Sequence, residues 1–445
     1  MFKKILIANR GEIAVRIIRA CKEMGIATVA VFSEADRDAM HVTLADESYC
    51  IGSARVKDSY LNMSAILTVA MSVKAEAIHP GYGLLSENAK FSALCEQCGI
   101  IFIGAKSDVI KQMGDKNAAR ITMKNSGVPV IPGSEIIADL KQAEEQAAKI
   151  GYPLMLKASA GGGGKGIRVV KESSELASAF NSASSEAAAA FGDGRLYIEK
   201  FLKPVKHIEM QLICDNFGGI VCLGERDCSV QRKNQKLIEE TPSVAVTPEL
   251  REKLTEAATT AAKAVGYNGV GTVEFLLDRQ GNFFFCEMNT RLQVEHPVTE
   301  MVTGIDLVKW QIRVAAGIPL DFTQDSVKIS GHSIECRINA EDPKNGFRPC
   351  AGKISFLHVP GGPWIRFDTS VYLGYVVPPF YDSMLGKLIV FAGTREEALR
   401  KMQASLCELV VEGIDTNIDF LINILDNEEF TKGIYTTDLL KTSGE

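Results

Sequence analysis

Two acidic residues in the segment "GTVEFLLDRQGNFFFCEMNTRLQVEHPVTE" have a spacing that suits shared metal chemistry. The apolar runs on either side of "DRQG" predict two strands joined by a tight turn. If Leu277 pairs with Asn282, side-chain alternation places Glu274 and Glu287 on one face of the pair. The two carboxylates are then one diagonal step apart, about 7 to 8 Å between backbone positions, so both side chains reach one ion.

Magnesium is the ion that this arrangement favours. Because "TVEFLL" and "FFFC" are typical of a buried strand pair, carboxylates between them require a partner. Mg²⁺ (or Mn²⁺) prefers oxygen ligands and shares its coordination sphere between one or two carboxylates and phosphate oxygens. We therefore expect a metal–nucleotide site at Glu274, Glu287 and Asn289; the alternative is a solvated strand face. If the chain stays extended, the same face continues with Arg291, Gln293 and Glu295.

A second candidate lies in "KASAGGGGKGIRVV", where Gly161, Gly162, Gly163 and Gly164 precede a lysine. The glycines satisfy GxGxxG, but the dinucleotide-binding version must open a helix, and "GIRVVKES" predicts a strand. The P-loop is excluded because it requires Ser or Thr after the lysine, where this chain has glycine. We expect a strand–turn–strand flap whose backbone N–H groups close over phosphates. The alternative is an ordinary surface turn.

The elements that position these residues begin with a βαβ unit at the N-terminus. "KKILIAN" predicts a strand, "GEIAVRIIRACKEMG" a helix and "ATVAVFSE" a second strand. "KAEAIHPGYG" and "GIIFIGA" are short apolar runs that lead into glycine-rich turns, so we expect a parallel sheet with ligands at its carboxyl edge. The first turn lacks GxGxxG, which argues against a dinucleotide domain.

The segment "RLYIEKFLKPVKHIEMQLICD" predicts two strands separated by a break at a proline. In the second strand His207, Glu209 and Gln211 alternate with apolar residues, so one face of the strand is polar. A polar strand face is most often only hydrated, and the alternation alone identifies no function. The break near Leu202 is a predicted hinge between a lid and its body.

Composition limits the function classes. The chain has 445 residues, of which 46% are hydrophobic and 23% charged, with a net charge of −6; this predicts a folded multidomain protein. The modest charge argues against nucleic acid or an anionic membrane as the main partner. No apolar segment is long enough to span a bilayer, and the N-terminus lacks the apolar core of a signal peptide. We therefore expect a cytoplasmic protein whose 11 cysteines are reduced.

Taken together, the motifs resemble biotin carboxylase, a family of the ATP-grasp superfamily. The resemblance extends over essentially the whole chain and rests on "ANRGEIAVRIIRA", "HPGYGLLSEN", "KASAGGGGKG", "ERDCSVQRKNQK", "EMNTRLQVEHPVTE", "ECRINAEDP" and "YDSMLGKLIV". It implies an α/β and α+β multidomain fold. The implied parts are a Rossmann-like parallel-sheet domain (1–113), an ATP-grasp domain (114–330) with a mobile glycine-rich lid (130–203), and a mixed α/β C-terminal domain (331–445).

The resemblance also implies a role for each candidate residue. The implied ATP contacts are Lys116, Lys157, His207, Gln231 and Asn234, the glycine flap, and the backbone at Glu199, Lys200 and Leu202, which holds adenine. Magnesium is held by Glu274 and Glu287 with Asn289 nearby. Bicarbonate is surrounded by Lys236, Arg291, Gln293, Val294 and Glu295. The biotin ureido ring faces Arg337, Tyr82 and Gly83, although Arg337 has the alternative of a structural ion pair with Glu335 or Glu341.

The implied reaction has two stages. Glu295 deprotonates bicarbonate, which attacks the γ-phosphoryl group of ATP to give carboxyphosphate. Breakdown of carboxyphosphate supplies CO₂ and a phosphate base, and N1 of biotin becomes carboxylated. A polyphosphate, a carbonate and an enolate in one cleft need several fixed cations, since one charge pair at about 4 Å contributes only about 4 kcal/mol at an effective dielectric near 20.

The chain contains no Met-Lys-Met sequence, the usual site of biotin attachment. We therefore expect biotin to arrive on a separate biotin carboxyl carrier protein. The resemblance further implies a homodimer that assembles with the carboxyltransferase subunits of a bacterial-type acetyl-CoA carboxylase, which makes malonyl-CoA for fatty acid synthesis. The chain departs from the family at Asn234, where histidine is usual, and at Cys350, where serine is common; asparagine can donate a hydrogen bond but carries no charge.

Three alternatives stay open at this point. The first is the biotin carboxylase subunit of another acyl-CoA or pyruvate carboxylase. The second is another ATP-grasp ligase, such as a carbamoyl-phosphate or purine-pathway enzyme, which shares the magnesium carboxylates and the flap but not "HPGYG" together with "ECRINAEDP". The third is a nucleotide-sensing module that binds ATP without turnover and therefore lacks the bicarbonate residues.

Overall fold

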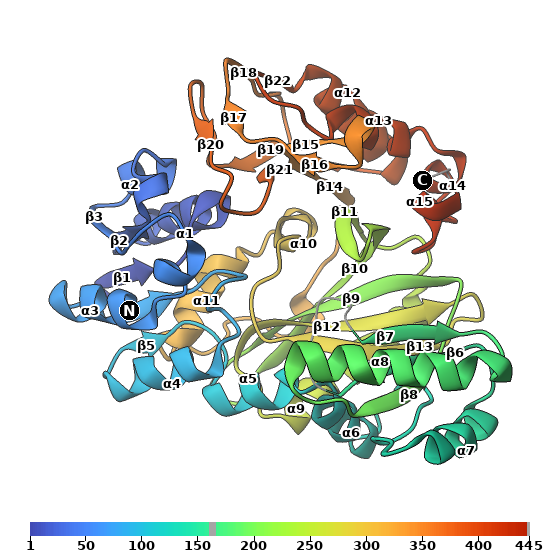
Figure 1. Ribbon diagram of the computed structural model, residues 1–445. Coiled ribbons are helices and arrows are strands. Elements are labelled where there is room, and N and C mark those ends of the chain that lie inside the picture. Colours follow the sequence, from blue (N-terminus) through green and yellow to red (C-terminus); the bar gives the residue numbers. More distant parts are fainter. Residues whose placement is uncertain (160–165, 443–445) are drawn as a thin grey trace.

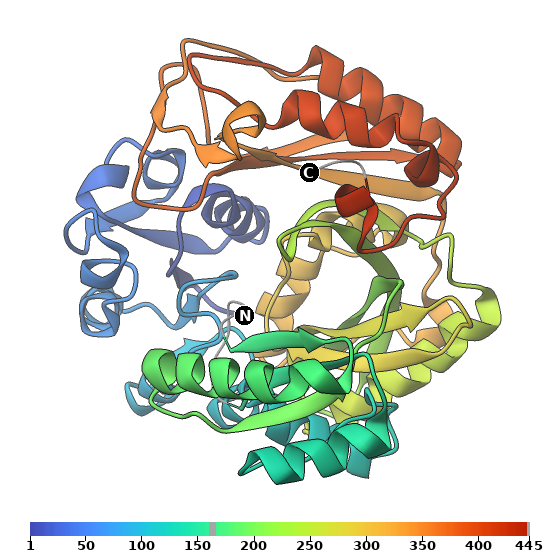
Figure 2. The ribbon, with the colours of Figure 1, turned by 45° about the vertical axis from the view of Figure 1, so that its right-hand side comes forward.

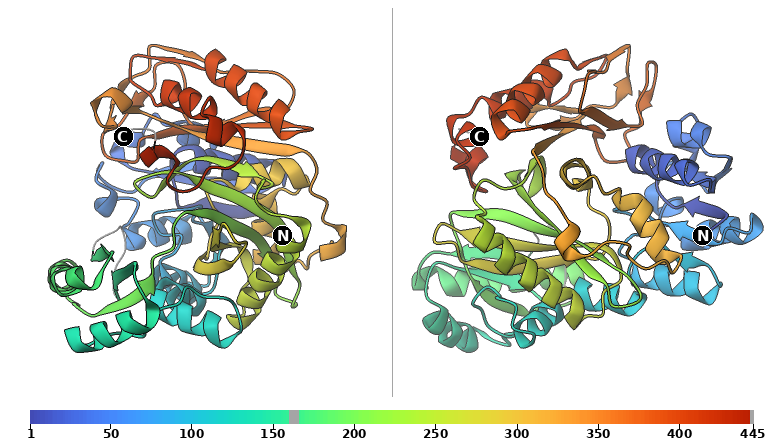
Figure 3. Two further views of the ribbon diagram at one scale, coloured as in Figure 1. Left: turned by 90° about the vertical axis from the view of Figure 1, so that its right-hand side faces the viewer. Right: turned by 180° about the vertical axis from the view of Figure 1, so that it is seen from behind.

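The computed structural model describes residues 1–159 and 166–442 of the chain. An N-terminal part, drawn in blue, and a C-terminal part, drawn in orange and red, lie beside a central part in green and yellow (Figure 1). Figure 2 shows the three parts arranged around the middle of the molecule. In both views of Figure 3 the C-terminal helices, in red, and the bright-green segment around residues 167–200 lie at opposite ends. The predicted α/β multidomain fold is confirmed.

The N-terminal part contains a parallel sheet, as predicted, and the sheet has five strands in the order β3-β2-β1-β4-β5. Since β1 and β4 pair side by side, the turn after each strand reaches the same edge of the sheet. Asn9 follows β1 and Tyr82 follows β4, so residues more than 70 positions apart in sequence meet there. The strands are β1 (Lys4–Ile7), β2 (Ala27–Phe32), β3 (Glu47–Cys50), β4 (Ala77–His79) and β5 (Ile101–Phe102), and the helices of this part are α1 (Gly11–Glu23), α2 (Met40–Leu44), α3 (Met63–Ser72) and α4 (Ala89–Gln97).

A mainly antiparallel eight-stranded sheet forms the centre of the molecule, in the order β13-β12-β9-β10-β11-β14-β21-β19. Its β11 and β14 are hydrogen-bonded neighbours, with Ile238 opposite Cys336. The sheet therefore runs without a break from the central part into the C-terminal part. Its strands are β9 (Val205–Cys214), β10 (Ile220–Arg232), β11 (Gln235–Thr241), β12 (Gly269–Asp278), β13 (Phe283–Asn289), β14 (His332–Asn339), β19 (Ile365–Thr369) and β21 (Met384–Ala392).

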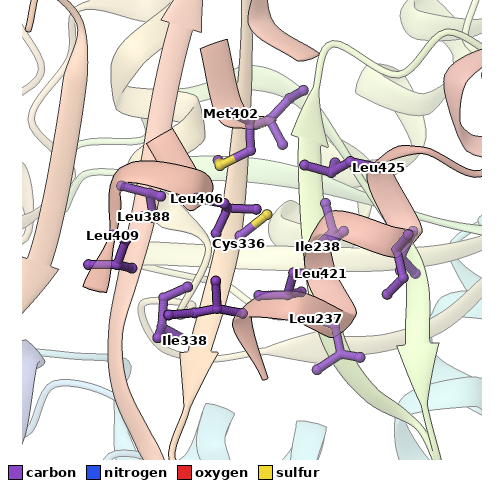
Figure 4. Packing of buried hydrophobic residues seen from close by; sticks show 14 of the residues in the cluster. Leu237, Ile238, Cys336, Ile338, Leu388, Met402, Leu406, Leu409, Leu421 and Leu425 are labelled. Atoms are coloured by element: carbon purple, nitrogen blue, oxygen red, sulfur yellow. The ribbon is translucent and has the colours of Figure 1, made fainter. Parts of the chain in front are cut away.

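Each half of this sheet buries one face under helices. In β9 the apolar residues Ile208, Met210 and Leu212 share a core with the alanines of α9 (Pro248–Ala264). In the C-terminal half Cys336, Ile338 and Leu388 pack under α12 (Arg395–Glu408) and α13 (Ile418–Leu425) (Figure 4). Because side chains alternate along a strand, the residues between these apolar ones project from the opposite face of the sheet.

A separate three-stranded sheet forms the green segment, in the order β7-β6-β8. β6 (Leu154–Ala158) and β7 (Ile167–Val170) are antiparallel, so the two strands predicted on either side of the glycines are confirmed. Gly161, Gly162, Gly163 and Gly164 lie outside the described residues. The sheet is completed by β8 (Leu196–Lys200), and helices α7 (Leu140–Ile150) and α8 (Leu176–Phe191) pack against it.

The remaining elements are short. Among the described residues, no helix combines the length and the apolar character needed to cross a membrane. The other helices are α5 (Ser107–Gly114), α6 (Lys116–Asn125), α10 (His296–Thr303), α11 (Leu307–Ala315), α14 (Glu428–Thr431) and α15 (Leu439–Thr442), and the small ribbons are β15 (Glu341–Asp342) with β16 (Arg348–Pro349), β17 (Gly352–Lys353) with β20 (Val376–Val377), and β18 (Phe356–His358) with β22 (Val410–Glu412).

Candidate active site

A cleft of about 850 Å³ lies where the three parts of the chain meet. Its volume falls within the range of pockets that hold small molecules. It is lined by turns of the N-terminal sheet, by the polar face of the eight-stranded sheet, and by the C-terminal segment around β14. The predicted site residues that line it are Tyr82, Gly83, His207, Gln231, Asn234, Lys236, Glu274, Glu287, Asn289, Arg291, Gln293, Val294, Glu295 and Arg337.

The register of the β12–β13 hairpin differs from the prediction. Leu277 pairs with Phe283 and not with Asn282. The register then shifts between Phe275 and Glu274, so Glu274 lies directly opposite Glu287 and not one diagonal step away. A β-bulge of this kind inserts one extra residue into one strand and re-aims the side chains beyond it. The prediction that both carboxylates share a face holds, but their expected separation was wrong.

Glu274 is buried and accepts hydrogen bonds from several donors. Lys236 Nζ and Gln293 Nε2 each lie 2.9 Å from its Oε1, and Asn289 Nδ2 lies at the same distance. His207 Nε2 lies 2.8 Å from its Oε2. Burial alone raises the pKa of Glu274, but Lys236 and His207 outweigh burial and hold it well below its usual value. Glu274 is therefore ionised at neutral pH.

Lys236 connects three carboxylates at the centre of the cleft. Its Nζ lies 2.7 Å from Glu209 Oε2, 2.9 Å from Glu274 Oε1 and 2.6 Å from Glu295 Oε1. Burial lowers the pKa of Lys236, but the three carboxylates raise it well above its usual value. Lys236 is therefore a cation held in one position by carboxylates from β9, from β12 and from the turn before α10.

Most of the polar face of β9 is buried, contrary to the interpretation that the sequence alone favours, and only His207 on it lines the cleft. Glu209 and Gln211 are fully buried. Both accept hydrogen bonds from the fully buried guanidinium of Arg226, which also donates to Thr299 Oγ1 at 2.8 Å. Buried polar groups in such a network hold one another in a single arrangement, so this face is a rigid floor for the cleft.

Glu295 and Arg337 form a second pair in the cleft. Arg337 Nη2 lies 2.9 Å from Glu295 Oε2, and Arg337 Nε donates to Glu239 Oε1 at 2.7 Å. The ion pairs of Arg337 are thus with Glu239 and Glu295, and not with the alternative partners Glu335 and Glu341. Burial raises the pKa of Glu295, but Lys236, Arg337 and Arg226 together hold it well below its usual value.

The chain after Asn289 does not stay extended, because β13 ends there and α10 begins at His296. The residues between nevertheless reach the cleft through a compact turn. Arg291 lies in this turn and donates to Glu87 Oε2 at 2.8 Å, to Gln293 Oε1 at 2.6 Å and to Asn289 Oδ1 at 3.1 Å. Its bond to Glu87 attaches the turn to the N-terminal part.

The lysines expected at the phosphates and the residues expected at the adenine are a separate group in the described structure. Within the described part of the chain, the cleft lining excludes Lys116, Lys157, Glu199, Lys200 and Leu202. Lys116 Nζ lies 3.4 Å from Glu287 Oε2, which does line the cleft, and Lys157 contacts Glu199. The Lys200 side chain is turned to backbone carbonyls, with its Nζ 2.9 Å from Tyr152 O.

Asn234 occupies a tight turn between β10 and β11. Arg232 pairs with Gln235, so the loop has two residues, and Lys233 and Asn234 have φ values of 48° and 64°. Two successive positive φ values define a type I′ turn, in which asparagine is strongly preferred. Asparagine therefore suits this turn, but histidine is also enriched at positive φ, so the turn does not explain the departure from histidine.

The turn after β4 is held from the N-terminal strand. Asn9 Nδ2 donates to Pro80 O at 2.6 Å and to Tyr82 O at 2.8 Å, and the Tyr82 hydroxyl donates to Glu12. Gly83 has φ +65°, a conformation that glycine adopts without steric cost. Tyr82 is therefore presented to the cleft in a fixed orientation.

The donor set fits the magnesium ion that the fold family implies. Glu274, Glu287 and Asn289 supply hard oxygen ligands, and the Glu287 side chain is 39% exposed and therefore open to a ligand. Metal-ligand atoms of His207, Glu209 and Glu274 also lie within 4.8 Å of one another, as do those of Glu209, Cys228 and Glu295. Glu287 belongs to neither group.

Several residues of the site were missed in the sequence. For all of them except Glu87, which lies in an exposed turn, the signal is a charged side chain inside a strand or helix that is otherwise largely buried, a pattern that buried ion pairs produce. "VCLGERDCSV" and "KLIVFA" both show it. The missed residues are Glu12, Glu87, Arg226, Glu239 and Lys387.

Comparison with known proteins identifies the family. Residues 1–110 match the biotin carboxylase N-terminal domain, residues 115–323 the ATP binding domain of the carbamoyl-phosphate synthase L chain, and residues 335–442 the biotin carboxylase C-terminal domain. The chain is 53% identical to biotin carboxylase 1 of Bacillus subtilis, with 99% of each chain covered. It is also 53% identical to a pyruvate carboxylase subunit of Methanothermobacter thermautotrophicus, with 97% of this chain and 88% of the relative covered.

A solved structure of the same kind superposes closely. It is the biotin carboxylase domain dimer of Hydrogenobacter thermophilus 2-oxoglutarate carboxylase, in complex with MgADP, ADP and bicarbonate. The TM-score is 0.94 at 51% identity, with 99% of this chain and 98% of that chain covered. The chain is not assigned to the carbamoyl-phosphate synthases, because its N-terminal and C-terminal parts both match domains of biotin carboxylase. The chain belongs to the biotin carboxylase family and is an ATP-dependent carboxylating ligase.

Proposed function

We propose that this protein carboxylates biotin on a separate biotin carboxyl carrier protein, using ATP and bicarbonate, as the first half-reaction of an acetyl-CoA carboxylase. Malonyl-CoA for fatty acid synthesis is then the final product. We further propose that the protein works in the cytoplasm as a homodimer together with carboxyltransferase subunits. The homodimer is supported by the dimeric form of the Hydrogenobacter thermophilus relative.

The observation that carries the proposal is the position of Lys236. It contacts Glu274, the proposed magnesium ligand, and Glu295, the proposed base, within one hydrogen-bond length of each. A cation that joins these two carboxylates suits a reaction in which bicarbonate attacks a metal-bound phosphoryl group. A module that only senses nucleotides has no need for a base beside its metal ligand.

The charge pattern supports a proton-accepting role for Glu295. Its carboxylate is ionised because Lys236 and Arg337 stabilise it. A carboxylate held this strongly is a weak base. We infer that incoming bicarbonate and phosphate compete for the same two cations, which weakens their hold on Glu295 and raises its basicity when the substrates are in place.

The other cations have matching roles in the proposal. Arg291 and Gln293 orient the carbonate, with the backbone at Val294, while His207, Gln231 and Asn234 contact the nucleotide. Lys116 and Lys157 contact its phosphates, and Arg337 stabilises the enolate of biotin as carboxyphosphate, formed from bicarbonate and ATP, breaks down. Magnesium, when held by Glu274, Glu287 and Asn289, neutralises phosphate charge during transfer.

We propose the domain limits 1–113, 114–330 and 331–445 for this chain. The continuous pairing of β11 with β14 means that the second limit separates chain segments and not sheets. We also propose that the segment 130–203 is a lid that closes over the phosphates of the bound nucleotide.

A second function has support from the relatives. The chain is equally similar to a bacterial biotin carboxylase and to a subunit of a pyruvate carboxylase, and it is nearly as similar to a 2-oxoglutarate carboxylase domain. The half-reaction is the same in each case, because the acyl or keto-acid acceptor binds to the carboxyltransferase. The alternative is therefore the biotin carboxylase subunit of another acyl-CoA or a pyruvate carboxylase.

ATP hydrolysis tests the half-reaction. We expect hydrolysis to require bicarbonate and magnesium and to be stimulated by free biotin, with each component omitted in turn. Hydrolysis that ignores bicarbonate would contradict the proposal. Adding purified carrier and carboxyltransferase with acetyl-CoA, pyruvate or 2-oxoglutarate then distinguishes the acceptors by the carboxylated product.

A further inference from the structure

Lys387 is a fully buried lysine in the middle of β21. It lies opposite Arg337 on β14 and opposite Asp368 on β19. It is absent from the described lining of the cleft, so it does not touch a substrate there. A buried ammonium group is costly unless its donors are satisfied, so its contacts indicate what it does.

The ammonium group of Lys387 contacts two different parts of the chain. Its Nζ donates to the backbone carbonyl of Val294 at 2.7 Å. The same atom lies 3.2 Å from Glu12 Oε1. Glu12 comes from α1 and accepts the hydroxyl hydrogen bond of Tyr82. One cation of the C-terminal part therefore holds both the turn before Glu295 and the tyrosine of the N-terminal part.

These contacts determine the positions of two groups that act at different stages of the proposed reaction. Val294 directly precedes Glu295, and α10 begins at the next residue, so fixing the Val294 carbonyl fixes the turn that presents the carboxylate. Glu12 keeps only one of its oxygens in hydrogen bonds, and its other oxygen has no partner in the described structure. The orientation of Glu12 thus depends on Lys387 and Tyr82.

We propose that Lys387 is a positioning residue that couples the bicarbonate end of the site to the biotin end. Through Val294 it sets the position of Glu295, and through Glu12 it sets the position of Tyr82. This inference rests on the proposed function. A lysine that serves only folding would make the same two contacts to satisfy its donors, so the two roles are distinguished by kinetics.

Two variants separate the contact of Lys387 with Val294 from its contact with Glu12. Lys387→Met removes both contacts and keeps an unbranched side chain of similar length. It is expected to lower bicarbonate-dependent ATP hydrolysis without biotin by about 100-fold, because a small displacement of a reacting group has an effect of that order. It is also expected to raise the KM for free biotin. Glu12→Gln keeps the bond to Val294, so it is expected to raise the KM for biotin by a larger factor than it lowers the biotin-independent hydrolysis.

A matched control removes a buried ion pair elsewhere. Arg395 contacts Glu240 in the C-terminal core, away from the cleft lining, so Arg395→Met reports the effect of lost stability alone. Melting temperatures are measured for all variants. The proposal is overturned if Lys387→Met changes kinetics no more than Arg395→Met, or if Glu12→Gln leaves the KM for biotin unchanged.

Two further outcomes are distinguishable. If Lys387→Met does not fold, Glu12→Gln alone decides, because the proposal requires its KM for biotin to rise by a larger factor than its biotin-independent hydrolysis falls. If the wild-type protein shows no bicarbonate-dependent hydrolysis, the proposed function fails, whereas an active wild type with unaffected variants overturns only the role of Lys387.

Discussion

Glu274 and Glu287 face each other directly across the β12–β13 pair, yet their environments differ. The Glu274 side chain is 5% exposed and surrounded by donors, whereas the Glu287 side chain is 39% exposed and lies 3.4 Å from Lys116. One bulge therefore brings together a carboxylate that is part of the buried network and a carboxylate that is open to a ligand.

This difference predicts unequal effects of removing each charge. Glu287→Gln is expected to raise the magnesium concentration needed for half-maximal activity while the melting temperature changes little, because it removes one hard ligand from an exposed position. Glu274→Gln is expected to raise the magnesium requirement and also to lower the melting temperature, since it leaves Lys236 and His207 without their shared partner. Magnesium titrations of activity check the first effect. Unchanged magnesium dependence in both variants would count against the metal site.

The type I′ turn at Asn234 leads to a second prediction. Asn234→Gly is expected to keep the stability of the protein, because glycine adopts φ 64° without strain. Asn234→Ala is expected to lower it by about 1 kcal/mol, since a Cβ without a polar group disfavours this conformation. Thermal melting compares the two variants. If both variants change the KM for ATP by the same factor, the Asn234 side chain contacts the nucleotide. If Asn234→Ala and Asn234→Gly are equally stable, the positive φ of this turn does not determine which residues it accepts.

Local patterns predicted much of the fold. The parallel N-terminal sheet, the alternation along β9 and the hairpin around "DRQG" all follow from periods of two or from turn residues, which neighbouring residues determine. The bulge at Glu274 did not follow, because one inserted residue leaves the hydrophobic pattern almost unchanged. The short strand β3 also lacks an apolar run, with most of its residues exposed.

The charged network required the tertiary structure. Lys236 and Glu295 are 59 positions apart, and Lys387 and Val294 are 93 positions apart. No local spacing relates such residues, so their types were visible in the sequence while their partners were not. Arg337 shows the same limit, because a buried arginine was expected and both carboxylates near it in sequence were the wrong partners.

Glu239 predicts a pH-dependent stability. Burial raises the pKa of its carboxyl group from 4.5 to about 7, although Arg337 opposes the shift. Between these two values the folded protein binds more protons at this site than the unfolded chain, so the stabilising contribution is complete below pH 4.5 and is lost as the pH rises through about 7. Glu239→Gln removes this titration, so its melting temperature relative to the wild type is expected to rise with pH over that window.

The adjacent residue Glu240 is a control, because its pKa is shifted in the opposite direction. Burial raises the pKa of Glu240, but His332 and Arg395 outweigh burial and lower it to about 2. Its stabilising contribution is present above pH 4.5 and is lost only as the pH falls through about 2. The difference between Glu240→Gln and the wild type should therefore be constant where that of Glu239→Gln changes. A constant difference for both variants would contradict the assignment to Glu239.

Arg337 provides the sharpest test of the reaction, because it contacts the proposed base and lines the cleft where biotin is expected. If Arg337 stabilises the biotin enolate, its loss acts mainly on the transition state for carboxyl transfer. Removing a donor of this kind typically costs about 3 to 4 kcal/mol, or about 100- to 1000-fold in rate. Arg337→Ala is therefore expected to lose biotin carboxylation by that order.

The contact with Glu295 makes the companion activity informative. Lys236 still holds Glu295 in Arg337→Ala, so bicarbonate-dependent ATP hydrolysis without biotin should fall much less than carboxylation. The two activities are measured alongside a melting curve, since Glu239 loses its partner in the same variant and some stability is lost with it. Adding Glu239→Gln to Arg337→Ala is expected to restore stability without restoring carboxylation, because it neutralises the carboxylate left unpaired and supplies no cation to the enolate. Equal loss of both activities, or recovery of carboxylation in the double variant, would mean that Arg337 serves as a structural ion pair.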